Sequence, residues 1–239
     1  IETNADPLAL PGVGTELVLP EQEINPGVVL EGPKQAMNPL ILRGNPKLRL
    51  DFIERRGGSE ETEKAVRRAL DWFTRNQEKD GYWRGEAGHY TAATGMAMLA
   101  YMGWGAKHTE PGPYQKPLAK AVEWMLREEK NGDLRGRSHR GNMYDHGIAG
   151  LAMVEAYGVT KDRKLLPRAQ SAVDFIESSQ NKTTGGWRYK AKGDGGFETQ
   201  KGDLSVSGWI IMVLASAEMS GLKVNAETLD GAREFLDEM

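Results

Sequence analysis

Two aspartates stand where apolar stretches of the chain begin. Asp145 precedes the stretch from His146 to Ala156, and Asp203 precedes the stretch that ends at Ala215. Two carboxylates that face one cavity can serve as the acid and the base of a hydrolytic reaction. Aspartate also caps helices, because its carboxylate accepts backbone N–H bonds at a helix start. The sequence leaves both interpretations of this pair open.

Histidine supplies a second kind of chemistry near the same positions. His146 follows Asp145 directly, and His89 lies shortly before an earlier apolar stretch. Histidine and aspartate are zinc ligands, so these three side chains form a candidate metal site. Their spacing matches no recognised metal motif. We therefore expect no metal and no cofactor.

Three apolar stretches each contain a glycine, and the residue before it is polar every time. These polar residues are Thr94, His146 and Ser207. In one interpretation they line a pocket; in the other they bond to backbone groups at buried helix starts. The pocket interpretation adds further candidate lining residues: Tyr90, Tyr144, Asp145, Asp203, Ser205 and Trp209.

The elements that must position these residues are helices of two alternating kinds. Ser59, followed by acids, predicts a helix start, and Val66, Leu70 and Phe73 then recur at helical spacing. Amphipathic outer helices are expected near 60–77, 115–129, 165–180 and 227–239, and apolar inner helices near 91–104, 144–157 and 204–220. Units of this kind must stack on one another to bury their apolar faces.

A longer motif repeats where each outer helix ends. Its two fullest copies read Trp72-Phe73-x3-Gln77-x3-Gly81-x-Trp83 and Phe175-Ile176-x3-Gln180-x4-Gly185-x-Trp187. A copy between them keeps the frame but has Glu129 and Leu134 at the glutamine and tryptophan positions. A fourth copy begins at Ala232, and the sequence stops at Met239 before its glutamine position.

This frame resembles the QW motif of squalene–hopene and oxidosqualene cyclases, and related repeats occur in the β subunits of protein prenyltransferases. The resemblance covers about residues 60–239. It implies an all-α fold, an α/α toroid of helical hairpins, with three hairpins and the start of a fourth in this chain. It also implies a structural clamp that ties neighbouring repeats together, made by Gln77, Trp83, Gln180 and Trp187. A missing C-terminal half or a homo-oligomer would complete the ring.

The resemblance does not extend to the family's chemistry. The cyclases protonate an alkene with the middle aspartate of an Asp-x-Asp-Asp-Thr-Ala motif, and the matching segment here is Asp203-Leu204-Ser205-Val206. The prenyltransferase zinc site needs a cysteine, and the chain has none. We therefore expect a binding or assembly scaffold, without a catalytic residue, that takes an unknown apolar ligand or protein partner. The alternative is an enzyme acting on an isoprenoid or other apolar substrate, with its catalytic residues in an absent C-terminal half.

Composition sets the remaining expectations. A net charge of −3 gives no electrostatic reason to expect nucleic acid, and no stretch is long and apolar enough to span a membrane. Seven of the 11 prolines fall within the first 46 residues, which rules out regular helix there. Residues 1–57 are expected to form a proline-rich extended arm or a disordered linker, ahead of a repeat domain at 58–239. The chain starts at Ile1, so we expect any targeting segment to be out of view, and the compartment stays open.

Overall fold

The computed structural model describes residues 40, 49, 53–55, 57–136 and 141–239. Seven α-helices have defined bounds in this part: α3 (Glu60–Arg75), α4 (Tyr90–Gly103), α5 (Gln115–Glu128), α6 (Met143–Thr160), α7 (Leu166–Ser178), α8 (Leu204–Met219) and α9 (Ala226–Asp237). A short 3-10 helix, η1, spans Glu86–Gly88. The described residues contain an isolated bridge between Lys130 and Asp133 and no β-strand. The predicted all-α class is confirmed there, and predicted helix ends differ from these bounds by at most three residues.

The arm predicted for residues 1–57 lies mostly outside the described residues. Leu40, Arg49 and residues 53–55 belong to the described part, and they are helical rather than extended. Leu40 is only 1% exposed. Arg49 pairs with Glu63 of α3 at 2.8 Å. These contacts attach the end of the predicted arm to the helices.

Local sequence signals fix the start of the first long helix. The side chain of Ser59 accepts the backbone N–H of Thr62, and Thr62 returns a bond to the backbone of Ser59. Acids follow in the first turn of α3, where they favourably meet the positive end of the helix dipole. The cap predicted at Ser59 is confirmed.

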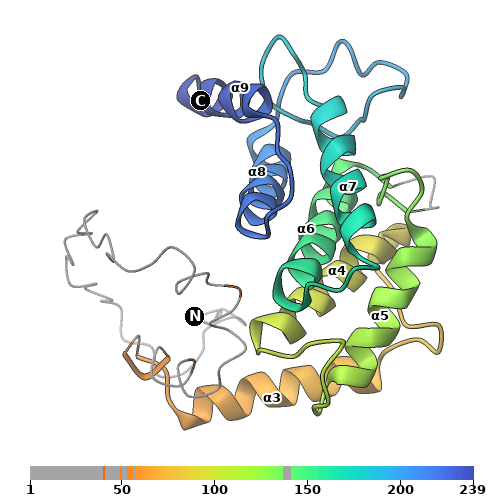
Figure 1. The fold of residues 1–239 in the computed structure, drawn as a ribbon, viewed down its shortest axis with the longest axis vertical. Helices are drawn as coiled ribbons and strands as arrows, with labels where there is room; N and C mark the ends of the chain where they lie inside the picture. The colour runs from red at the N-terminus through yellow and green to blue at the C-terminus, as the bar shows by residue number, and fades with distance from the viewer. Residues whose placement is uncertain (1–39, 41–48, 50–52, 56, 137–140) are drawn as a thin grey trace, which may run out of the picture. The chain divides into compact units, whose positions relative to one another are not determined.

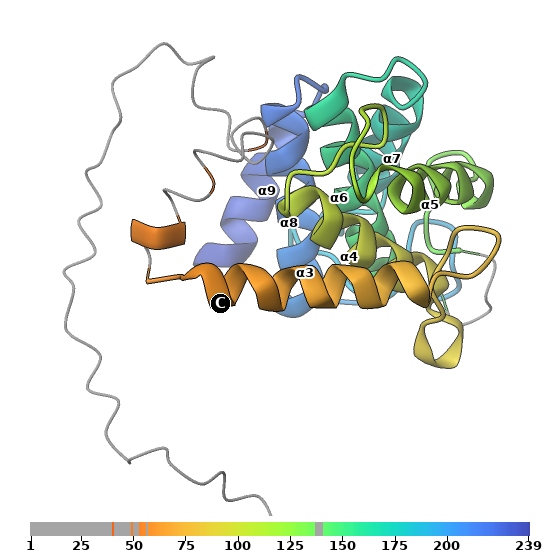
Figure 2. The same ribbon diagram turned by 90° about the horizontal axis from the view of Figure 1, so that it is seen from below.

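The inner helices α4, α6 and α8 lie side by side, and the outer helices α3, α5, α7 and α9 flank them (Figures 1 and 2). Helix α6 packs against α4 on one side and α8 on the other. As a result, 13 of its 18 residues are buried. This alternation confirms the helical-repeat character of the chain. No helix of the described residues is long and apolar enough to cross a membrane.

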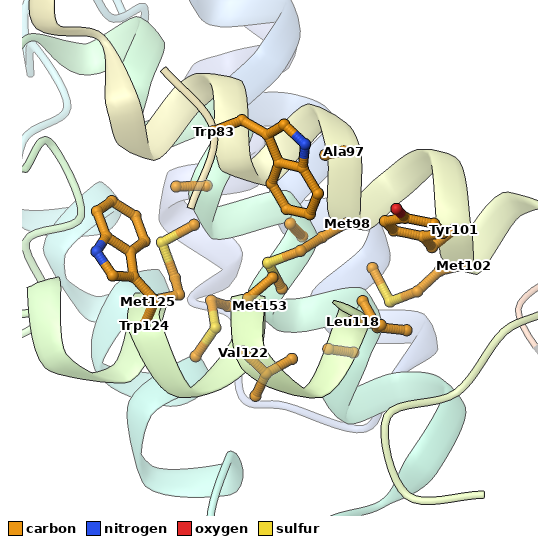
Figure 3. Close-up of a cluster of buried hydrophobic side chains, with 14 of the residues drawn as sticks. Trp83, Ala97, Met98, Tyr101, Met102, Leu118, Val122, Trp124, Met125 and Met153 are labelled. Atoms are coloured by element: carbon orange, nitrogen blue, oxygen red, sulfur yellow. The ribbon is translucent and has the colours of Figure 1, made fainter. Parts of the chain in front are cut away.

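One large core cluster joins α4, α5 and α6 and is rich in methionine (Figure 3). Met98, Met125 and Met153 are fully buried, and Trp83 is 5% exposed. Unbranched methionine side chains fill irregular gaps between helices. A second cluster joins α6, α7 and α8 around Trp187. Together the clusters hold the inner helices against the turns that follow the outer helices.

Candidate functional site

The repeated glutamine links three segments of the structure. Gln180 follows α7, and its Nε2 donates to the carbonyl oxygen of Gly185 at 2.8 Å and to that of Thr228 at 2.9 Å. Thr228 belongs to the first turn of α9, so this one side chain joins an outer helix, its turn and the next outer helix. Gln77 donates the equivalent bonds to the carbonyl oxygens of Gly81 at 2.8 Å and Pro117 at 2.9 Å.

The glycine of the motif is required where its turn packs closely against the next outer helix. Gly185 has a φ of 72°, a left-handed conformation that side-chain-bearing residues rarely adopt. A Cβ atom there would also collide with the carbonyl oxygen of Gly231 on α9. Gly81 and Gly132 have the same constraint, against the carbonyl oxygens of Lys120 and Ser171 respectively.

The repeated tryptophan ties each turn to its own outer helix. Trp187 is 1% exposed, and its indole N–H donates to the carbonyl oxygen of Ile176 at 2.9 Å. Trp83 makes the equivalent bond to Phe73 at 2.9 Å. Of the two motif side chains, the glutamine therefore bonds to the neighbouring repeat, whereas the tryptophan's hydrogen bond stays within one repeat.

The altered second copy makes a clamp of different chemistry. Glu129 accepts the backbone N–H of Gly132 at 2.5 Å and pairs with Arg168 at 2.5 Å. Arg168 lies in the first turn of α7, at the position that Pro117 and Thr228 occupy in the other repeats. An ion pair thus replaces the amide-to-carbonyl bond between neighbouring outer helices. Sequence reasoning missed Arg168, which is 39 residues from Glu129.

The polar residues before the inner-helix glycines share one role. Each is fully buried and accepts a backbone N–H from the turn after the preceding outer helix. The pairs are Thr94 with Trp83 at 3.1 Å, His146 with Leu134 at 3.2 Å, and Ser207 with Trp187 at 2.9 Å. At 0% exposure these side chains have no surface open to solvent or to a cavity. The observed contacts therefore match the interpretation in which these side chains bond to backbone groups at buried helix starts.

Both ring nitrogens of His146 are occupied. Because Nδ1 accepts the N–H of Leu134, Nε2 carries the proton and donates to the carbonyl oxygen of Ala172 at 3.2 Å. Burial lowers the pKa of His146 to about 4, so the ring is neutral near pH 7. No nitrogen lone pair is left for a metal ion. Among the described residues, no group of three histidine, cysteine or acidic side chains is arranged to hold one.

Asp145 joins the starts of α4 and α6. Its carboxylate accepts the backbone N–H of Asn142 at 3.0 Å in a capping box and lies 2.9 Å from Nδ1 of His89. The aspartate side chain is fully buried, and the histidine side chain is 36% exposed. A carboxylate beside Nδ1 favours the tautomer with hydrogen on that atom, which leaves the lone pair on Nε2 of a neutral ring.

Asp203 caps α8 and ends a short hydrogen-bond chain. Its Oδ1 accepts the backbone N–H groups of Ser205 and Val206, each at 3.1 Å, and the hydroxyl of Ser205 at 2.5 Å. These bonds, with the Ser205 hydroxyl first, lower the pKa of Asp203 against the opposing effect of burial. The hydroxyl of Tyr144 donates to the Ser205 oxygen, whose own proton is engaged by Asp203.

The predicted pocket residues therefore fall into four groups. Thr94, His146 and Ser207 face the turns, whereas Asp145 pairs with His89. Tyr144, Ser205 and Asp203 form the hydrogen-bond chain. The last two candidates are partly exposed: Tyr90 lies beside the ring of Tyr82, and Trp209 packs against α6 near Gly147. Comparison with known proteins adds no assignment, since no family model, no curated protein and no solved structure matches the chain.

Proposed function

We propose that this protein is a squalene-cyclase-like helical-repeat scaffold that binds an apolar ligand or a protein partner and carries no terpene cyclase chemistry. The observation that carries the proposal is the state of Asp203, the one aspartate left at the cyclase acid motif. It is an ionised helix cap that accepts three hydrogen bonds. Its pKa is lowered, whereas an acid that protonates an alkene must hold a transferable proton.

The neighbouring residue does not replace the missing acid. Ser205 stands where the cyclases have their proton donor, and its hydroxyl proton is directed at Asp203. A serine hydroxyl is far too weak an acid to protonate an alkene. Tyr144, the next group in the hydrogen-bond chain, donates its phenol proton to the Ser205 oxygen. Each donor in this hydrogen-bond chain points toward the carboxylate of Asp203, so the chain of bonds presents no acidic proton to a substrate.

The recurring hydrogen bonds of the motif support the proposed similarity to squalene-cyclase repeats. Gln77 and Gln180 make matched bonds to their turns and to the next outer helices, and Trp83 and Trp187 make matched bonds within their repeats. The QW resemblance implies such a stabilising role. An arc of an α/α toroid is the architecture that we propose for this stack.

Purified protein incubated with squalene and with oxidosqualene tests the absence of cyclase chemistry. We expect no hopanoid or sterol product, and none from the Ser205→Asp/Val206→Asp double variant, which restores carboxylates without a tuned environment. Product that forms with the unaltered chain and disappears in Asp203→Asn would overturn the proposal. Mass spectrometry of the extracted lipids provides the measurement.

A second candidate function, an enzyme acting on an isoprenoid or another apolar substrate, is favoured by the pairing of His89 with Asp145. A buried carboxylate on Nδ1 of a partly exposed imidazole is the arrangement of a general base. Hydrolysis of acyl esters of increasing chain length would test it. Turnover that His89→Gln abolishes, with the fold intact by circular dichroism, would favour the enzyme; equal background rates would count against it.

A further inference from the structure

The inner helices touch through one repeated contact. A Cβ atom on Gly95 of α4 would lie 3.0 to 3.1 Å from the backbone of Ile148 and Ala149 on α6. A Cβ atom on Gly147 of α6 would lie 3.0 Å from Cβ of Trp209 on α8. In both cases a glycine on one inner helix receives the residue that directly follows the glycine of the next inner helix. The contact therefore has a direction along the stack.

The contact has no continuation at the α8 end of the described structure. Gly208 is the equivalent glycine, and nothing lies within 4 Å of the position that its Cβ would take. Apolar residues on the same face of α8 are exposed: Leu204 by 49% and Met212 by 44%. Each lies four residues from Gly208, which places both in one stripe with that glycine. We call this stripe the α8 face.

The α4 end carries the complementary half of the contact. Met96 follows Gly95, so it holds the position of Ile148 and Trp209 in the other repeats. Those two pack on a glycine of the preceding inner helix, whereas Met96 is 48% exposed. Within the described residues, the stack therefore has an unfilled glycine site on α8 and an exposed apolar side chain on α4.

We propose that the α8 face binds a second copy of this chain, head to tail, with Met96 of that copy seated on Gly208. The proposal rests on the scaffold function above and names its partner. It extends the contact that already joins α4 to α6 and α6 to α8. Helix α4 contains no charged residue and α8 contains only Glu218, so the two faces meet without like-charge repulsion. A contact of this heterologous kind closes into a ring or extends as a filament.

Analytical ultracentrifugation of the 239-residue chain at increasing concentration tests the proposal. The unaltered protein should associate reversibly. Met96→Glu and Gly208→Glu should each raise the dissociation constant about tenfold or more, because each buries a charge at one half of the contact. Leu166→Glu is the matched control, since Leu166 is 42% exposed on the outer helix α7. It should associate like the unaltered protein.

Mixing the two variants tests the direction of the contact. The Met96→Glu variant keeps an intact Gly208 site, and the Gly208→Glu variant keeps an intact Met96, so an equimolar mixture should form dimers that neither variant forms alone. A protein that stays monomeric at every concentration would overturn the proposal. Association weakened by Gly208→Glu but not by Met96→Glu would overturn it too, as would a mixture without dimers. Circular dichroism confirms that each variant is folded. Cyclase turnover by the unaltered chain would defeat only the scaffold function, so the two failures are distinguishable.

Discussion

Replacing Gln180 with glutamate changes a hydrogen-bond donor into an acceptor at a buried junction. The glutamine is 3% exposed, and its Nε2 serves the carbonyl oxygens of Gly185 and Thr228 together. An ionised glutamate has no hydrogen to offer either oxygen. It would also place a negative charge beside two carbonyl dipoles that point at it.

The expected cost follows from those two bonds. A buried acceptor that loses its donor costs about 1–3 kcal/mol, so two such groups cost about 2–6 kcal/mol. Lys182, whose Nζ lies 3.1 Å from Oε1 of Gln180, would offset part of this by pairing with the new charge. We expect Gln180→Glu to lower the free energy of unfolding by about 2–4 kcal/mol at neutral pH. Burial beside two carbonyl oxygens raises the pKa of a glutamic acid at this position. The loss should therefore shrink as pH falls toward about 4.3, because the protonated acid regains one donor.

The natural glutamate at the equivalent position supplies the control. In Glu129→Gln the amide oxygen can still accept the N–H of Gly132, but an NH2 group replaces the charged oxygen that accepts from Arg168, so the Arg168 bond is lost. The Arg168 side chain is 50% exposed, so water can solvate it, and the loss should be about 1 kcal/mol or less. Urea denaturation at constant m-value measures both variants. If Gln180→Glu and Glu129→Gln lowered the free energy of unfolding by amounts that agree within about 0.5 kcal/mol, the donor-and-acceptor reasoning would be refuted.

Further substitutions test other parts of the structure. Alanine at Trp83 or Trp187 should cost about 3–5 kcal/mol in chemical denaturation, and a loss below about 1 kcal/mol at both would contradict the buried clamp. Gly185→Ala should cost more than about 1 kcal/mol, because the left-handed backbone and the nearby carbonyl both oppose a side chain; an unchanged midpoint would count against it. The pKa of His146 is about 4 in the folded protein and about 6.5 in the unfolded chain. The free energy of unfolding should therefore keep the whole His146 contribution above pH 6.5 and lose about 3 kcal/mol of it as the pH falls to 4. His146→Asn keeps an acceptor for Leu134 and should flatten this pH dependence, whereas an equally steep profile would assign it to another group.

The helices were predictable because their signals are local. Apolar spacing, the cap at Ser59 and the glycines after each outer helix together place all seven helices of the repeat region within three residues. The clamp role expected of Gln77 and Gln180 came from the resemblance to the QW motif, which did not name their partners Pro117 and Thr228. The apolar periodicity of a helix predicts which of its faces is buried. It therefore also predicts that amphipathic outer helices pack against apolar inner helices.

The partners of the polar residues were not predictable, because they depend on contacts distant in the chain. Aligning the glycines showed that Thr94, His146 and Ser207 are equivalent, but not whether they face a cavity or a turn. His89 and Asp145 meet across 56 residues without a motif to link them. The pairing of Glu129 with Arg168 is likewise visible only once α7 lies beside the end of α5.

The shared role of the polar residues before the inner-helix glycines is tested most directly by amide hydrogen exchange. The backbone N–H groups of Trp83, Leu134 and Trp187 lie outside any helix, yet each donates to one of these buried side chains. The structure predicts that all three exchange as slowly as the buried amides of α6, and that Ser207→Ala speeds exchange at Trp187 far more than at Trp83. Fast exchange at all three in the unaltered protein would contradict the account.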